Sequence, residues 1–145
     1  MFRFNQAWLL DSLNGSVYYG FAVLTGKQER LKTSVKYFEK SWQLDSTESK
    51  ILPDWALSLV ELYERVNDTL SLKKSEVLLD KFLSKDTSYA NAFELRASCY
   101  YYKKEYEKAW QNLHKCRKIN EKEVPVGLIN ALLKVSSDPT GFYKK

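Results

Sequence analysis

The clearest alternation of apolar and polar positions runs from Phe93 to Ile119. Apolar and small residues recur there every three or four positions on both sides of the polar stretch Lys103-Lys104-Glu105, as they do on one face of an α-helix. The pattern therefore predicts two amphipathic helices joined by a short turn. Weaker versions of the same pattern occupy much of the remaining chain.

The pattern repeats at nearly constant intervals. The order Phe, small residue, Trp, Leu, Asp, Ser runs from Phe4 to Ser12 and again from Phe38 to Ser46, an offset of 34 residues. Corresponding positions near the ends of later helices are Leu79 and Leu113, so the successive intervals are 34, 41 and 34. Repetition at this length indicates a stack of helical hairpins in which each hairpin buries its apolar face against its neighbours.

These intervals predict a single domain, 1–145, made of a half unit, three complete units and a terminal helix: 1–12, 14–46, 47–87, 88–121 and 124–136. The middle unit is degenerate, and its seven extra residues divide between the Thr47–Leu52 loop and a long helix from about 53 to 67. The terminal helix is expected to cover the last apolar face of the stack. Because the first unit is incomplete, we expect that the chain has been trimmed or that the natural protein extends upstream.

The unit 88–121 resembles the tetratricopeptide repeat (TPR) family, whose pattern of about 34 residues is Trp-x2-Leu-Gly-x2-Tyr, then Ala-x3-Phe, then Pro. Arg96 replaces the Leu, and we expect it to bury its aliphatic stem and expose its guanidinium group. The resemblance implies an all-α fold, a right-handed TPR-like α-solenoid of helical hairpins with a C-terminal capping helix. The residues at the Trp, Gly, Tyr, Ala, Phe and Pro positions are, in that order, Phe93, Ala97, Tyr100, Ala109, Leu113 and Glu121.

In the TPR family, the first helix of each unit lines a concave face on which peptides usually bind. The resemblance therefore implies a non-enzymatic protein–protein interaction scaffold that binds a peptide or protein. Tyr101 and Tyr102 are the strongest candidates because Tyr100 and Tyr106 already meet the demand of the core; the alternative is that they cover the middle unit or the groove. The candidate partner-binding residues are Tyr19, Val23, Lys27, Asn91, Glu94, Ser98, Tyr101 and Tyr102.

One subset of the family grips the C-terminal carboxylate of its partner with Lys, Asn and Arg side chains in the groove. Tyr19 and Val23 occupy the matching places in the first complete unit. This clamp is therefore absent, and binding of chaperone tails is not predicted.

The net charge of +5 suggests two alternatives to peptide binding. Residues 101–145 contain ten Lys and Arg but five Asp and Glu, whereas residues 1–100 are balanced. A basic end is compatible with an acidic partner, RNA or another nucleic acid. Because no dense basic run is present, a solvated, mildly basic surface is the preferred interpretation. Self-association is the second alternative, through the apolar half unit at Phe4, Ala7 and Trp8. The basic residues considered for nucleic-acid binding are Lys103, Lys104, Lys108, Lys115, Arg117 and Lys118.

Residue types that carry catalysis or bind metal are too few to predict an enzyme. Cys99, Cys116 and His114 do not supply a zinc ligand set, so no metal and no cofactor are expected. We expect the two cysteines to be buried and His114 to lie on the surface. No apolar run reaches the ~18 residues of a membrane span. We therefore expect a soluble domain, cytoplasmic or exported behind an upstream signal that this sequence lacks.

Overall fold

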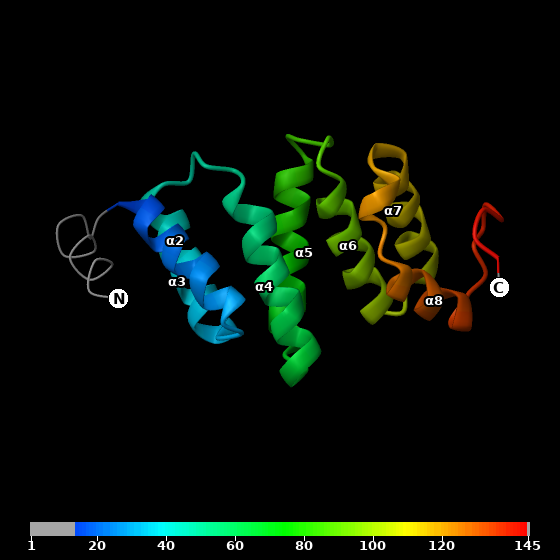
Figure 1. The fold of residues 1–145 in the computed structure, drawn as a ribbon, viewed down its shortest axis with the longest axis horizontal. Helices are drawn as coiled ribbons and strands as arrows, with labels where there is room; N and C mark the ends of the chain where they lie inside the picture. The colour runs from blue at the N-terminus through cyan, green and yellow to red at the C-terminus, as the bar shows by residue number, and fades with distance from the viewer. Residues whose placement is uncertain (1–13, 145) are drawn as a thin grey trace.

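The computed structural model describes residues 14–144, and in this part of the chain it contains helices and no β-strand. The helices follow one another along the long axis of the molecule, with α2 near one end and α8 near the other (Figure 1). The predicted all-α, TPR-like fold is confirmed. The α-helices are α2 (Gly15–Lys27), α3 (Leu31–Leu44), α4 (Ile51–Val66), α5 (Thr69–Leu83), α6 (Ala90–Tyr102), α7 (Tyr106–Ile119) and α8 (Val126–Val135), with a 3₁₀ turn η1 (Glu121–Glu123).

The turns that follow α2 and α6 have the same backbone geometry. Glu29 and Lys104 each have a positive φ, 61° and 63°. The next residue donates its N–H to a carbonyl in the last turn of the helix, from Arg30 to Thr25 at 2.9 Å and from Glu105 to Tyr100 at 2.9 Å. These bonds satisfy carbonyls that the helix end leaves free and turn the chain back to form a hairpin.

The hairpin α4–α5 uses a different turn. Asn67 takes the left-handed conformation at φ 56°, which asparagine tolerates better than most residues. Asp68 then caps α5 by accepting hydrogen bonds from the backbone N–H groups of Leu70 and Ser71. The long helix predicted from about 53 to 67 is confirmed as α4, and Pro53 lies in its first turn as expected. The predicted Thr47–Leu52 loop is too long, because Ile51 and Leu52 are buried and belong to α4.

The core lies between the helices, at positions that the repeat pattern makes equivalent. Phe38, Leu79 and Leu113 are 2%, 0% and 0% exposed. Small buried residues let the two helices of a hairpin approach closely. In α2–α3, the Ser34 hydroxyl donates to the Ala22 carbonyl at 2.7 Å, so a polar side chain is buried without losing its hydrogen bond.

The last helix covers the end of the stack together with the segment that follows it. α8 contacts α7, and Leu132 is fully buried. Residues 136–144 then turn back, and the ring of Tyr143 stacks on Trp110 of α7 with 6.0 Å between ring centroids. One part of the α7 surface is therefore covered by a helix and by a short tail.

Cys99 and Cys116 are fully buried free cysteines, as expected. No helix among residues 14–144 is long and apolar enough to cross a membrane. The half unit at 1–12, with Phe4, Ala7 and Trp8, lies outside the described residues. The division of the chain into repeat units stays a prediction.

Candidate partner-binding surface

We use the name first-helix face for the surface that α2, α4 and α6 present away from their hairpin partners α3, α5 and α7. All eight predicted binding residues belong to α2 or α6. Lys27 is exposed, and the other seven are partly buried. Their role in binding stays a prediction. The two helices that carry them, α2 and α6, lie on either side of α4 and both contact it.

α2 and α4 enclose a groove of about 320 Å³ on this face. Tyr19, Val23 and Lys27 line one wall. The opposite wall comes from α4 and includes Asp54, Leu57 and Glu61, none of which the sequence singled out as a binding residue. The sequence offers no basis for choosing them, because the repeat pattern of the middle unit is degenerate.

A hydrogen bond joins the two walls of this groove. The Tyr19 hydroxyl donates to Oδ2 of Asp54. Burial, and then this bond and the charge of Asp54, raise the pKa of Tyr19 above its ordinary value of 10.0, so the hydroxyl stays a donor at neutral pH. The Tyr19 ring also packs edge-on against Phe38, with centroids 6.0 Å apart. Tyr19 is thus held in place by contacts with α4 and α3.

A similar bond joins α6 to α4. The Tyr102 hydroxyl donates to Oε2 of Glu64 at 2.6 Å, and its ring lies 4.9 Å from that of Tyr63. Tyr102 therefore covers the middle hairpin, as the alternative interpretation expected. Tyr101 packs against Tyr102 and Tyr106, with centroids 5.4 and 6.1 Å apart. Both tyrosines keep part of their surface accessible.

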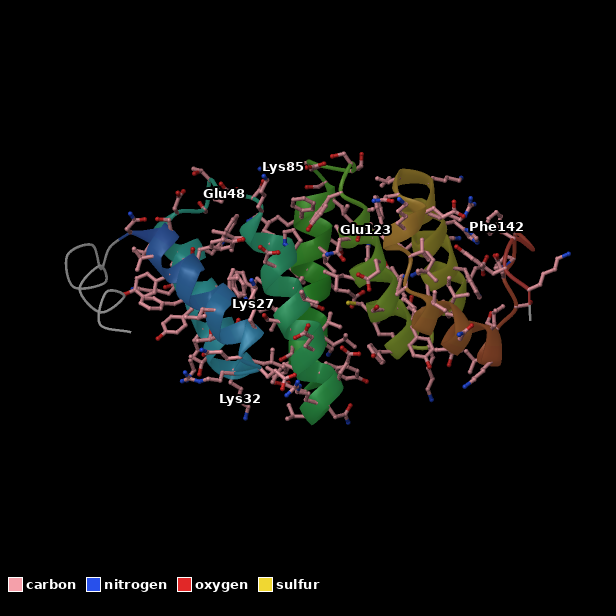
Figure 2. The ribbon with its side chains drawn as sticks, in the orientation of Figure 1. Lys27, Lys32, Glu48, Lys85, Glu123 and Phe142 are labelled. Atoms are coloured by element: carbon pink, nitrogen blue, oxygen red, sulfur yellow. The ribbon has the colours of Figure 1, made fainter. Side chains whose placement is uncertain are left out.

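Glu94 lies near two further carboxylates on this face. Burial, and then the charges of Glu123 and Glu64, raise its pKa to about 7. Glu123 belongs to the η1 turn and lies beside α6 (Figure 2). Burial and the charge of Glu64 also raise the pKa of Glu61, although Arg65 opposes the shift. The first-helix face thus holds carboxylates that have few cations near them.

The basic residues considered for nucleic-acid binding lie at the α6–α7 turn and on α7. Lys103 pairs with Glu76 at 3.0 Å and with Glu105 at 3.1 Å. Lys108 also pairs with Glu105, at 2.9 Å. The Arg117 guanidinium lies 3.9 Å from the centroid of the Phe142 ring. Several of these cations therefore already have partners within the protein.

The expectation that His114 lies on the surface is wrong. His114 is 6% exposed, because the tail after α8 folds over it. Nε2 lies 2.8 Å from Oδ1 of Asp138, and Nδ1 accepts a hydrogen bond from Nε of Arg117 at 3.4 Å. Both ring nitrogens are engaged, so this imidazole belongs to a structural network. Within residues 14–144, no three His, Cys, Asp or Glu side chains are grouped to hold a metal ion.

Comparisons with known proteins show the type of fold. No protein-family model and no curated protein matches the sequence. The structure of "MamA RS-1 ArsTM double mutant" is similar, with a TM-score of 0.79 and 12% identity over 95% of this chain and 75% of that one. The structure "First TPR of Spaghetti (RPAP3) bound to HSP90 peptide SRMEEVD" is similar, with a TM-score of 0.67 and 14% identity over 83% of this chain and 91% of that one. The chain therefore has the fold of a tetratricopeptide repeat solenoid.

Proposed function

We propose that this protein is a non-enzymatic scaffold that binds a peptide segment of a partner protein on its first-helix face, which we take to be the concave face of the solenoid. The observation that carries the proposal is the groove between α2 and α4, which contains three of the eight predicted residues. The similar TPR structure with a bound peptide supports the same kind of ligand. A fold alone does not determine a function, whereas the groove offers a defined surface for a ligand.

The groove has the mixture of surfaces that a peptide needs. Val23 and Leu57 supply apolar area, and the Leu57 residue is 38% exposed. Tyr19 and Asp54 fix one another by their hydrogen bond and so lose little freedom when a ligand binds. Tyr101 extends the same face over α6 and supplies a large side chain at low entropic cost.

A library of short random peptides displayed on phage would test the proposal with the wild-type protein as bait. Val23→Asn and Tyr101→Ala should each weaken a selected peptide by at least about tenfold, as loss of a contact residue does. Val77→Asn is the matched control, because Val77 is 65% exposed on the other layer of helices, in α5. Circular dichroism would check that each variant keeps its helices.

The outcomes separate this proposal from its alternatives. If the library yields no binder, the peptide-binding proposal is wrong. If Val77→Asn removes binding and Val23→Asn does not, a peptide binds but on the other layer of helices. Retention of RNA at low salt, lost steeply as salt rises, would favour the basic residues of α7. Sedimentation would detect self-association through Phe4, Ala7 and Trp8.

A further inference from the structure

Charge is separated between the two layers of helices. In α3, α5 and α7, Lys and Arg outnumber Asp and Glu by ten to four. In α2, α4 and α6 there are four acidic residues and three basic ones. Two of those three, Arg65 and Arg96, pair with Glu29 and Asp80, which lie outside these helices. The positive net charge of the chain therefore says little about the first-helix face.

The carboxylates of this face are concentrated along α4 and α6. Asp54 and Glu61 line the groove with α2. Glu64 and Glu94 lie farther along the face, and η1 adds Glu123, whose charge acts on Glu94. Asp54 and Glu64 accept hydrogen bonds from tyrosines, and Arg65 acts on Glu61, whereas the charges that act on Glu94 are those of other carboxylates. Because burying a carboxylate without a cation costs free energy, a cation supplied by a ligand would stabilise Glu94 most.

We propose that the segment bound on the first-helix face is basic, with Lys or Arg side chains that pair with Glu94 and Glu64 near α6 and with Asp54 and Glu61 in the groove. This inference rests on the proposed function, which says only that a peptide binds there. It adds the charge of the partner and the positions at which that charge is recognised. Charge complementarity of this kind selects partners and rejects those of the same sign.

The peptide in the similar TPR structure differs in charge from the segment inferred here. The peptide in that structure, SRMEEVD, contains three acidic residues and one basic residue. An acidic segment on the first-helix face of the present protein would meet Asp54, Glu61, Glu64 and Glu94, with Lys27 as the remaining basic residue of the three helices. Like charges brought together at an interface weaken binding, so we expect an acidic segment of this type to be rejected.

The fold also suggests a spacing for the basic residues. α4 contacts both α2 and α6, and packed helices lie about 8–10 Å apart. A polyproline II segment rises about 3.1 Å per residue and presents every third side chain on the same side, so such side chains lie roughly 9 Å apart. α2 has no carboxylate, so basic residues about three positions apart would meet one carboxylate of α4 and Glu94 of α6.

The test uses the complete chain and a set of matched peptides. One peptide carries Lys at positions about three residues apart in a framework of Pro, Leu and Tyr, and its companions carry Gln or Glu at the same positions. Fluorescence anisotropy at low salt should show the Lys peptide binding at least about tenfold more tightly than the Gln peptide, and the Glu peptide binding weakest.

The protein variants locate the effect. Glu94→Gln should weaken the Lys peptide by about fivefold and leave the Gln peptide unchanged, because each lost ion pair contributes about this much. Glu107→Gln makes the same change of charge at an exposed residue of α7 and should leave the affinity for the Lys peptide unchanged.

Failure of this inference is distinguishable from failure of the proposed function. The random library could select neutral or acidic peptides whose binding is lost in the Val23→Asn variant. A peptide would then bind on this face, but the inferred charge would be wrong. Equal weakening of the Lys peptide by Glu94→Gln and Glu107→Gln would also overturn the inference, since only the net charge of the protein would matter. An empty library would contradict both.

Discussion

Nε2 of His114 in α7 lies 2.8 Å from Oδ1 of Asp138, which follows the end of α8. The Asp138 side chain is fully buried. It also accepts hydrogen bonds from the backbone N–H groups of Thr140 at 3.0 Å and Tyr143 at 2.9 Å. One carboxylate thus organises the tail and fastens it to α7, so that the Tyr143 ring can stack on Trp110.

Replacing Asp138 with Ala should lower the free energy of unfolding by about 2–4 kcal/mol. The substitution leaves a buried histidine and two backbone N–H groups without their acceptor. Urea unfolding followed by circular dichroism measures the change. Asp86→Ala is the control, because Asp86 accepts similar local bonds from Ser88 in an exposed loop. Equal losses for the two variants would show that the contact with α7 contributes nothing.

The same carboxylate predicts a dependence of stability on acid pH. Burial alone would raise the pKa of Asp138, but the hydrogen bonds from Tyr143, His114 and Thr140 outweigh it and lower the pKa to about 2 from 3.8. Folded protein then binds this proton more weakly than unfolded protein. The stabilisation is therefore present above about pH 4 and is lost as the pH falls towards 2. Asp138→Asn should reduce the slope of unfolding free energy against pH in that window; an unchanged slope would contradict the assignment.

The features that the sequence predicts correctly are those that depend on residues close together in the chain. Periodic apolar positions identified the helices, and Phe38, Leu79 and Leu113 are buried where the repeat placed equivalent residues. Polar breaks predicted turns, and Asn67 ends α4 in the left-handed conformation. These features follow from the 3.6-residue period and from local backbone chemistry, which a single sequence contains.

Features that depend on contacts between distant residues were missed. His114 reads as a surface residue among Lys115, Arg117 and Lys118, and only the tail 24 positions later buries it. The surroundings of Glu61 and Glu64 likewise depend on α2 and α6, which lie on either side of α4 and are distant in sequence. The net charge of +5 does not extend to α2, α4 and α6, which together carry four acidic and three basic residues.

Tyr102→Phe should lower the free energy of unfolding by about 1 kcal/mol. The substitution removes the hydroxyl that donates to Glu64 across adjacent hairpins and keeps the ring contact with Tyr63. Tyr101→Phe is the control, since no hydrogen bond of its hydroxyl is found among residues 14–144 and it should change stability little. Thermal unfolding of both variants, analysed at one temperature, compares them. A larger loss for Tyr101→Phe would refute the bridging role.

Two glycines should respond in opposite ways to alanine. A Cβ at Gly127 in α8 meets nothing within 4 Å, so Gly127→Ala should raise stability by up to about 1 kcal/mol through helix propensity. A Cβ at Gly26 would lie 3.1 Å from Oγ of Ser34. That hydroxyl is bound to Ala22 and Ser58 and cannot move freely, so Gly26→Ala should lower stability. The urea concentration at the midpoint of unfolding, measured for both variants and for the wild type, shows whether stability rises or falls. A fall for Gly127→Ala or a rise for Gly26→Ala would contradict the prediction.

The affinity for a Lys-containing peptide should increase as the pH rises from about 6 to 8. The pKa of Glu94 is raised to about 7, so its ionised fraction climbs from roughly a tenth to nine-tenths over this range. The charges that act on it are those of Glu64 of α4 and Glu123 of η1. The charge of Glu94 in turn acts on the thiol of Cys116 in α7. Burial raises the pKa of that thiol to about 11, so it stays neutral throughout.

Anisotropy titrations at several pH values and constant ionic strength would measure this rise in affinity, which should be about threefold, below the loss of about fivefold expected for Glu94→Gln. Glu94→Gln should abolish the rise, because an amide does not titrate, whereas Glu107→Gln should preserve it. The Gln-containing peptide should show no rise with either protein. A pH profile that survives Glu94→Gln would assign the titration to another group and remove Glu94 from the recognition of basic side chains.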